Sequence, residues 1–167
     1  LKPEVFAMPM QCDIVTQERT VFSEQVDAVN LPAEEGRMGV LPNHMVMLTS
    51  LGFGEVIVRR GGEDEYFAIG GGFAEILPDK ITILADSAEQ AEEIDVERAQ
   101  KARERAERAM REGISEESER YAQIEAALRR AQVRIEVSRR RSSGRRRRAM
   151  AAGGEGAASP RREEETE

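Results

Sequence analysis

The sequence predicts an N-terminal antiparallel β-sandwich at residues 11–86, followed by a C-terminal antiparallel two-helix hairpin at residues 87–138. Two observations predict this order. Up to about Ala85, short runs of alternating apolar residues are separated by turn residues, which is typical of sandwiches and barrels. From Ser87 to Arg111 there is no Gly or Pro, and Ala and charged residues dominate, which is typical of a helix. Residues 1–10 form an N-terminal extension and residues 139–167 form a tail.

The β-region is divided by frequent turn signals. They recur every ~8–12 residues, and Gly61-Gly62 and Pro78-Asp79 are the clearest of them. We expect strands at residues 12–16, 19–23, 26–31, 36–42, 45–49, 55–59, 66–69, 73–77 and 81–84. Gly70-Gly71-Gly72 lies between two of these strands, and we predict a tight turn there.

Each predicted helix carries a narrow apolar stripe at spacings of three and four residues. The first stripe consists of Val96, Ala99, Ala102, Ala106 and Ala109, and the second of Tyr121, Ile124, Leu128, Ala131 and Ile135. Gly113 stands where a helix C-cap belongs, and Ser115 suits the start of the second helix. Because Ala buries little area, the hairpin should be only marginally stable alone, which suits a moving part.

Charge is distributed unevenly over the 167 residues, whose formal net charge is −7. Residues 1–93 carry 17 acidic and 6 basic side chains, and residues 139–167 carry 9 basic and 5 acidic ones. The acidic sandwich would repel phosphates, so no nucleic acid is expected as a partner.

The single cysteine, Cys12, cannot form a disulfide within the chain, which favours a reducing compartment. No apolar run approaches ~20 residues and no signal peptide is evident, so no direct membrane insertion is expected.

The tail begins with a run of arginines, Arg139 to Arg148, interrupted by Ser-Ser-Gly, and ends in acidic residues. It has almost no large apolar side chain to bury, so we predict that it is disordered. The arginines leave a second interpretation open, that of a nucleic-acid-binding adaptor. Steep salt dependence of nucleic-acid binding would favour that alternative.

No group of residues assembles a catalytic or metal site. His44 is the only histidine and lacks a partner for either role, so we expect it to serve in a turn. Gly70-Gly71-Gly72 lacks the spacing and context of a phosphate loop. The chain is therefore not expected to be an enzyme or to require a cofactor. The arginines at positions 98, 105, 130 and 134 lie either on solvated helix faces or around an anion that both helices reach.

Four motifs in order carry a resemblance to a known family. They are Gly36-Arg37-Met38-Gly39-Val40-Leu41-Pro42-Asn43-His44, then Gly71-Gly72-Phe73-Ala74-Glu75-Ile76, then Ile81-Thr82-Ile83-Leu84-Ala85-Asp86, and finally residues 88–99. In this order, and followed by a helical hairpin, they resemble the epsilon subunits of bacterial F-type ATP synthases over about residues 10–138. Val46 and Gln17 stand where that family commonly has Pro.

The resemblance implies a non-catalytic central-stalk subunit of a proton-translocating motor, peripheral to the cytoplasmic face of the bacterial plasma membrane. Its sandwich would dock on the gamma subunit and the c-ring. Its hairpin would permit rotation when folded, and would inhibit ATP hydrolysis when extended into the alpha/beta catalytic head.

The resemblance also implies ATP as a regulatory ligand of the folded hairpin. Ile94-Asp95-Val96-Glu97-Arg98-Ala99 matches the Ile-Asp-x-x-Arg-Ala motif of family members that bind ATP. By this resemblance, Glu89 and Asp95 would accept hydrogen bonds from the adenosine part, and arginines would hold the phosphates. The implied ATP-binding residues are Glu89, Ile94, Asp95, Arg98, Ala99, Arg105, Arg130 and Arg134.

Overall fold

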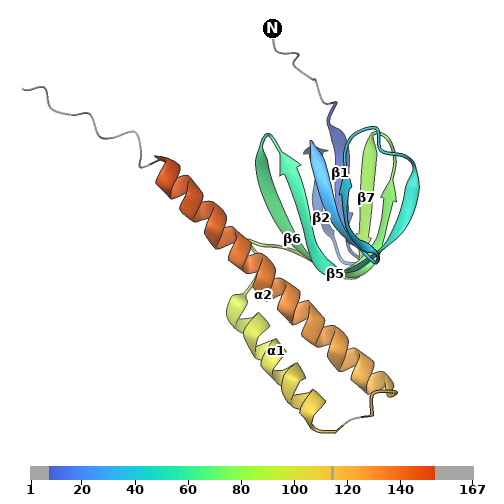
Figure 1. Cartoon of the computed structure of the whole chain (residues 1–167), viewed down its shortest axis with the longest axis vertical. Helices are drawn as coiled ribbons and strands as arrows, with labels where there is room; N and C mark the ends of the chain where they lie inside the picture. Colours follow the sequence, from blue (N-terminus) through green and yellow to red (C-terminus); the bar gives the residue numbers. More distant parts are fainter. Residues whose placement is uncertain (1–7, 114, 153–167) are drawn as a thin grey trace, which may run out of the picture.

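The fold is an eight-stranded sheet followed by two helices, seen in a computed structural model that describes residues 8–113 and 115–152. The strands are β1 (Met10–Val15), β2 (Thr20–Val26), β3 (Ala28–Ala33), β4 (Gly36–Val40), β5 (Met47–Arg60), β6 (Glu63–Ile76), β7 (Lys80–Ala85) and β8 (Ala88–Gln90). The helices are α1 (Val96–Arg111) and α2 (Glu119–Ala152). The sheet folds over itself into a sandwich, and the helices form an antiparallel pair beside it (Figure 1). The predicted fold class is confirmed.

The strand order is β2-β1-β7-β6-β5-β3-β4, and β8 also pairs with β6. All neighbouring strands are antiparallel except β1 and β7, which are parallel. Alternate residues point inward in β1 and β7, as the pleat requires, whereas the middle of β6 is buried on both faces. The core between the layers is mainly aliphatic, with Phe22 and Phe67 in an edge-to-face contact at 5.3 Å between ring centroids.

The tight turn predicted at Gly70-Gly71-Gly72 is wrong, because these glycines lie inside β6. β5 and β6 each run for 14 residues, where we expected four shorter strands. Such long strands bend to pass from one layer of the sandwich to the other. The backbone φ angles of Gly71 and Gly72 are +102° and +127°, values that L side chains rarely adopt, so glycine supplies the bend without ending the strand.

The first helix begins later than the composition suggests. Ala88–Gln90 pair with β6 as β8, and Asp95 then caps α1 by accepting a hydrogen bond from the Arg98 N–H at 3.0 Å. At the other end of α1, Gly113 has a φ of +74°, which confirms the predicted glycine stop.

The second helix also differs from expectation at both ends. Ser118, rather than Ser115, caps it, because the Ser118 hydroxyl accepts the Tyr121 N–H at 3.1 Å. The helix then continues through residues 139–152, which we had assigned to the tail, and its Ala and Arg residues are strong helix formers. Residues 153–167 lie outside the described residues. In the described ranges, neither helix is long and apolar enough to cross a membrane.

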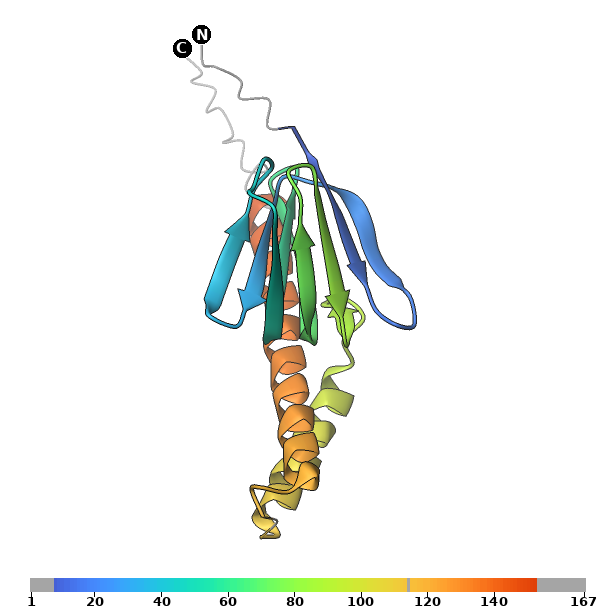
Figure 2. The ribbon, with the colours of Figure 1, turned by 90° about the vertical axis from the view of Figure 1, so that its right-hand side faces the viewer.

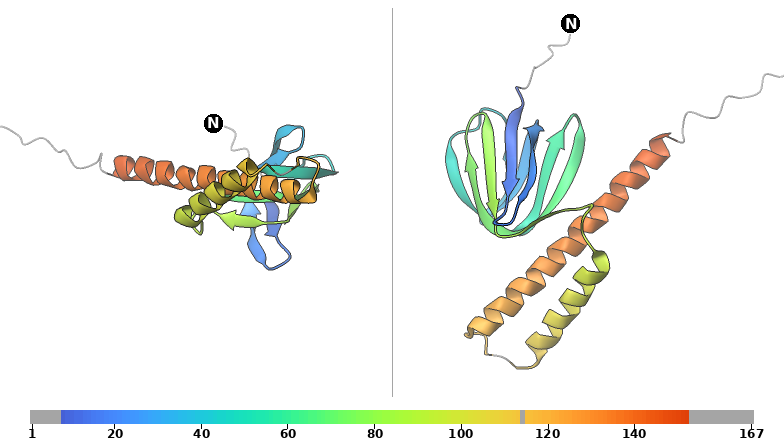
Figure 3. Two further views of the ribbon diagram at one scale, coloured as in Figure 1. Left: turned by 90° about the horizontal axis from the view of Figure 1, so that it is seen from below. Right: turned by 180° about the vertical axis from the view of Figure 1, so that it is seen from behind.

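The middle of α2 lies against the sandwich, while the tip of the hairpin projects beyond it (Figure 2, Figure 3). α2 contacts β5 and β6. The apolar contact is small: Val137 is fully buried against Ala68, Ala91 and Ile94, with Tyr66 and Val133 packed around them. Such a limited contact buries little apolar area and so contributes little to holding α2 on the sandwich.

Candidate functional site

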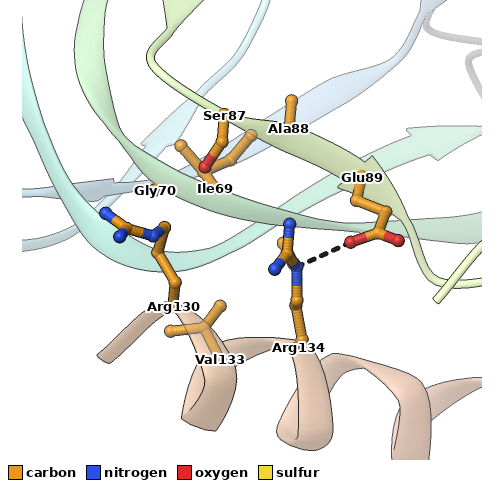
Figure 4. A pocket seen from close by; sticks show the side chains of 9 residues that line it. Ile69, Gly70, Ser87, Ala88, Glu89, Arg130, Val133 and Arg134 are labelled. Atoms are coloured by element: carbon orange, nitrogen blue, oxygen red, sulfur yellow. Dashed lines mark ion pairs between the residues drawn. The ribbon is translucent and has the colours of Figure 1, made fainter. Parts of the chain in front are cut away.

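A small recess, lined by both apolar and polar side chains, lies where α2 crosses β6 and β8. Its lining includes Gly70, Ser87, Glu89, Arg130 and Arg134. Both arginines rise from α2 toward the sheet, one turn apart on the helix (Figure 4). Arg134 Nε lies 2.7 Å from Glu89 Oε2, so an ion pair joins the hairpin to the sandwich at this point.

Arg130 occupies the other side of the recess. A Cβ atom on Gly70 would lie 3.4 Å from the Arg130 side-chain carbons and 2.1 Å from the Ser87 hydroxyl, so glycine leaves room for both side chains. Arg130 has no ion-pair partner among the residues that the structure describes. Its guanidinium is therefore available to an anion, and Arg134 is close enough to join if it leaves Glu89.

The recess continues toward the β1–β2 turn, where carboxylates outnumber cations. Arg19, Glu18, Asp86, Glu89, Glu93 and Arg134 are among the residues that line this part. Arg19 pairs with Glu93 at 2.5 Å, and the hydrogen bond from Arg19 lowers the pKa of Glu93. An incoming anion would thus meet the arginines of α2 on one side and acidic groups on the other. This arrangement suits a ligand with both anionic and hydrogen-bond-donating parts.

The structure brings together three of the eight predicted ATP-binding residues, namely Glu89, Arg130 and Arg134. Arg98 and Arg105 are exposed on α1 and line neither part of this recess. The other three have structural roles. Asp95 caps α1, Ile94 is buried against the sandwich, and Ala99 is buried in the hairpin.

Sequence reasoning missed Gly70 and Ser87 as lining residues. They are 17 positions apart, and they meet only because the Gly70 N–H donates to the Ser87 carbonyl at 2.9 Å beside the β6–β8 pairing. That pairing was not predicted, since Ser87 was assigned to a helix. The run of three glycines was the one feature of the sequence that could have drawn attention to Gly70.

No three His, Cys, Asp or Glu side chains among the described residues converge on a metal site. His44 lies in a turn. Its ring Nδ1 is 2.9 Å from the Met45 carbonyl oxygen, and its backbone N–H donates to the Leu41 carbonyl at 3.1 Å.

A second surface lies on the outer face of the sandwich, away from the core. Leu48, Phe73 and Leu84 are 71%, 53% and 55% exposed on β5, β6 and β7. The register pairs Phe73 with Leu84, and Leu48 stands on the same face. Exposed Leu41, Met45 and Val46 follow in the β4–β5 connection. Exposed apolar side chains on one face of neighbouring strands are typical of a protein-docking surface.

Residues 9–91 match the beta-sandwich domain of the ATP synthase Delta/Epsilon chain, and residues 92–139 match its long alpha-helix domain. The chain belongs to the ATP synthase delta/epsilon family. The resemblance noted in the sequence is thus confirmed, and this delta/epsilon chain is an epsilon-type subunit of the F-type ATP synthase.

Relatives of this delta/epsilon chain extend over most of its length. The ATP synthase epsilon chain of Herpetosiphon aurantiacus is 52% identical over 132 residues, which cover 79% of this chain and 96% of that relative. The epsilon chain of Dehalococcoides mccartyi strain CBDB1 is 45% identical over 135 residues, covering 77% and 91%. A chain in the Euglena gracilis mitochondrial ATP synthase, solved as OSCP/F1/c-ring, aligns with a TM-score of 0.57 at 27% identity over 81% of each chain.

Proposed function

We propose that this delta/epsilon chain is a non-catalytic rotor subunit that binds the gamma subunit and the c-ring, and that its hairpin controls ATP hydrolysis. Docked on the sandwich, the hairpin permits rotation. When released, the hairpin extends into the alpha/beta head and inhibits ATP hydrolysis. The chain would work at the cytoplasmic face of the bacterial plasma membrane, held there by its partners.

The observation that carries this proposal is the small, mixed contact between α2 and the sandwich. Val137 supplies the buried apolar anchor, and ion pairs such as Arg134 with Glu89 surround it. A contact of this size suits an equilibrium between docked and released states. The apolar outer face around Phe73 supports the partner assignment, because it remains uncovered in the isolated chain.

We further propose that ATP is a regulatory ligand of the docked hairpin. The phosphates would bind Arg130 and Arg134, and Glu89 would accept hydrogen bonds from the nucleoside. Since the recess needs α2 against the sheet, ATP would bind only the docked form and would shift the equilibrium by its differential affinity. Arg98 and Arg105 would contribute only if α1 moved when the ligand bound.

Two measurements test this function. An affinity-tagged chain should recover gamma and the catalytic subunits from solubilised membranes. A synthase carrying a chain truncated after Ala91 should remain assembled and hydrolyse ATP faster than the parent. Absence of gamma from the recovered material would refute the subunit assignment, and unchanged hydrolysis would refute regulation by the hairpin.

Calorimetry on the isolated chain tests the ligand. Arg130→Ala should weaken ATP binding by roughly ten-fold or more, the effect of losing one charge-assisted contact. Arg120→Ala, on an exposed part of α2, is the matched control and should leave affinity unchanged. No binding by the parent chain at millimolar ATP would remove ATP from the proposal.

A further inference from the structure

Glu55 is a largely buried carboxylate shared by arginines from two different elements. Its side chain on β5 is only 13% exposed. Arg37 Nη2, on β4, lies 3.1 Å from Oε1, and Arg140 Nε, on α2, lies 3.2 Å from Oε2. A single carboxylate thus links the edge of the sandwich to the helical hairpin.

The position of Glu55 matches the face that α2 presents to the sheet. Val133, Val137 and Arg140 follow one another at helical spacing on that face. Together with Glu55 they line one groove between α2 and the sheet. The ion pair and the buried apolar contact therefore lie on the same face of α2.

Two ion pairs flank the buried contact along one row of the sheet. Ala68, which packs against Val137, is the register partner of Glu55 on β5 and of Glu89 on β8. Arg134 meets Glu89, and Arg140 meets Glu55. The docked helix is thus held at three neighbouring points, an ion pair on either side of one apolar anchor.

These ion pairs differ in what can disturb them. The pair of Arg134 with Glu89 belongs to the recess assigned to ATP, so a bound anion competes for that arginine. The groove at Glu55 is lined by other residues, among them Pro32 and Phe53, and shares only Val133 with the recess. The pair of Arg140 with Glu55 therefore lies outside the recess assigned to ATP.

We propose that Glu55 is a latch that holds the hairpin docked through Arg140, independently of nucleotide. Arg37 orients the carboxylate and keeps it paired when α2 leaves, so release does not strand an unpaired charge. Neutralising Glu55 leaves Arg37 and Arg140 facing each other without their shared anion, which favours release. The idea rests on the proposed function, in which docking of the hairpin is the regulated event.

The test measures docking directly in the full chain without nucleotide. Cysteines replace the exposed residues Thr20 and Arg108, and nitroxide labels report the distance between sandwich and hairpin by pulsed electron resonance. Cys12 is fully buried and burial raises its thiol pKa to about 12, so it escapes labelling. The intact chain should give one dominant distance, which is the docked state.

Glu55→Gln should lower the ratio of docked to released molecules about five-fold, the factor expected for a charge-assisted contact worth about 1 kcal/mol. Arg140→Gln should also lower the ratio, and the double substitution should add little, because both changes remove the contact that joins α2 to Glu55. The matched controls Glu35→Gln, in the exposed β3–β4 turn, and Arg120→Gln should leave the ratio unchanged.

Equal ratios for Glu55→Gln and Glu35→Gln would overturn the latch, and so would additive effects of the two latch substitutions. If Glu55→Gln impairs folding by circular dichroism, Arg140→Gln alone decides, because that side chain is exposed on a helix. Nucleotide and partner subunits are absent from this measurement, so failure of the proposed ATP regulation or of gamma binding leaves its outcome intact.

Discussion

Asp95 fits two roles, that of a helix cap and that of a residue in the ATP-binding motif. Its carboxylate accepts the Arg98 N–H and so starts α1, while Ile94 before it is buried against the sandwich. Ala99 is buried where the helices meet, since a larger side chain would hold them apart. The motif that resembles an ATP site is therefore also what a docked helix start requires, and composition alone cannot separate the two roles.

Asp13 is a carboxylate of β1 with three side-chain partners. Lys80 Nζ lies 2.8 Å from Oδ2, and Gln11 and Ser23 donate to Oδ1 at 2.8 Å and 2.7 Å. The hydrogen bond from Lys80 is the main reason that the pKa of Asp13 falls from 3.8 to about 2. Because the folded pKa lies below the unfolded one, the stabilisation is present above pH ~4 and is lost as pH falls toward 2.

We predict that Asp13→Asn lowers the free energy of unfolding by about 1–2 kcal/mol at neutral pH. The loss of stability between pH 4 and pH 2 should also become shallower. Urea titrations of parent and variant at several pH values measure both effects, with Glu35→Gln as the control. The assignment fails if parent and variant lose stability equally over that interval.

Gly72 is the residue on which the bend of β6 depends most directly. A Cβ atom there would lie 2.1 Å from the Leu84 carbonyl oxygen, and its φ of +127° is unfavourable for any L residue. We predict that Gly72→Ala destabilises the chain by more than about 3 kcal/mol, since backbone and side chain are both in conflict. Thermal unfolding should show a midpoint many degrees lower.

Gly61 provides the matched control for Gly72. Its φ is +58°, yet nothing lies within 4 Å of the Cβ that alanine would add. Gly61→Ala should therefore cost only the local backbone strain of about 1 kcal/mol. Equal losses at the two positions would show that the close approach at Leu84 is unimportant.

At the scale of elements, the alternating apolar pattern identified nearly every strand but not how far each continues. The residue types around Gly70 are those of a turn, and only pairing with β5 and β7 reveals that the strand continues through them. The short β8 could not be predicted, because its residues favour a helix rather than a strand. Its Ala-Glu-Gln sequence has helix-forming composition, and pairing with β6 overrides that preference.

The same limitation applies to the candidate site. Arg130 and Arg134 could be predicted to share a helix face from their spacing, and the structure places both at the recess. That Arg98 and Arg105 lie elsewhere depends on how α1 is rotated against α2, which Ala spacing leaves undetermined. Glu55 gave no signal at all, because its partners come from residues 37 and 140.

Removal of residues 139–167 should separate docking from folding. The buried apolar residues all precede position 139 among those described, so we predict that the thermal midpoint of the sandwich changes little. The truncated chain loses Arg140, however, so the docked fraction should fall as it does for Arg140→Gln. Circular dichroism and the label distance report the two quantities separately, and a midpoint lowered by many degrees would contradict this division.

At the scale of the whole molecule, the surfaces divide by task. The hairpin covers one face of the sandwich at β5 and β6, where Glu55, Ala68 and Glu89 form its docking row. The apolar group of Leu48, Phe73 and Leu84 lies on the outer side of the other layer. A subunit bound there would leave the hairpin free to dock or release, as the proposed function requires.

Because the two surfaces are separate, one substitution should abolish binding of gamma while the fold and the docking of the hairpin are kept. Phe73→Glu places a charge in the centre of the apolar surface, where binding of gamma would have to bury it. Since the side chain is 53% exposed and points away from the core, the free energy of unfolding should change by less than about 1 kcal/mol. Recovery of gamma from membranes should fall by ten-fold or more, while the label distance between sandwich and hairpin stays that of the parent. Thr82→Glu, on the same face of the sheet but on a residue that is not apolar, is the control and should bind better than Phe73→Glu. Undiminished recovery with Phe73→Glu would move the gamma contact away from this face.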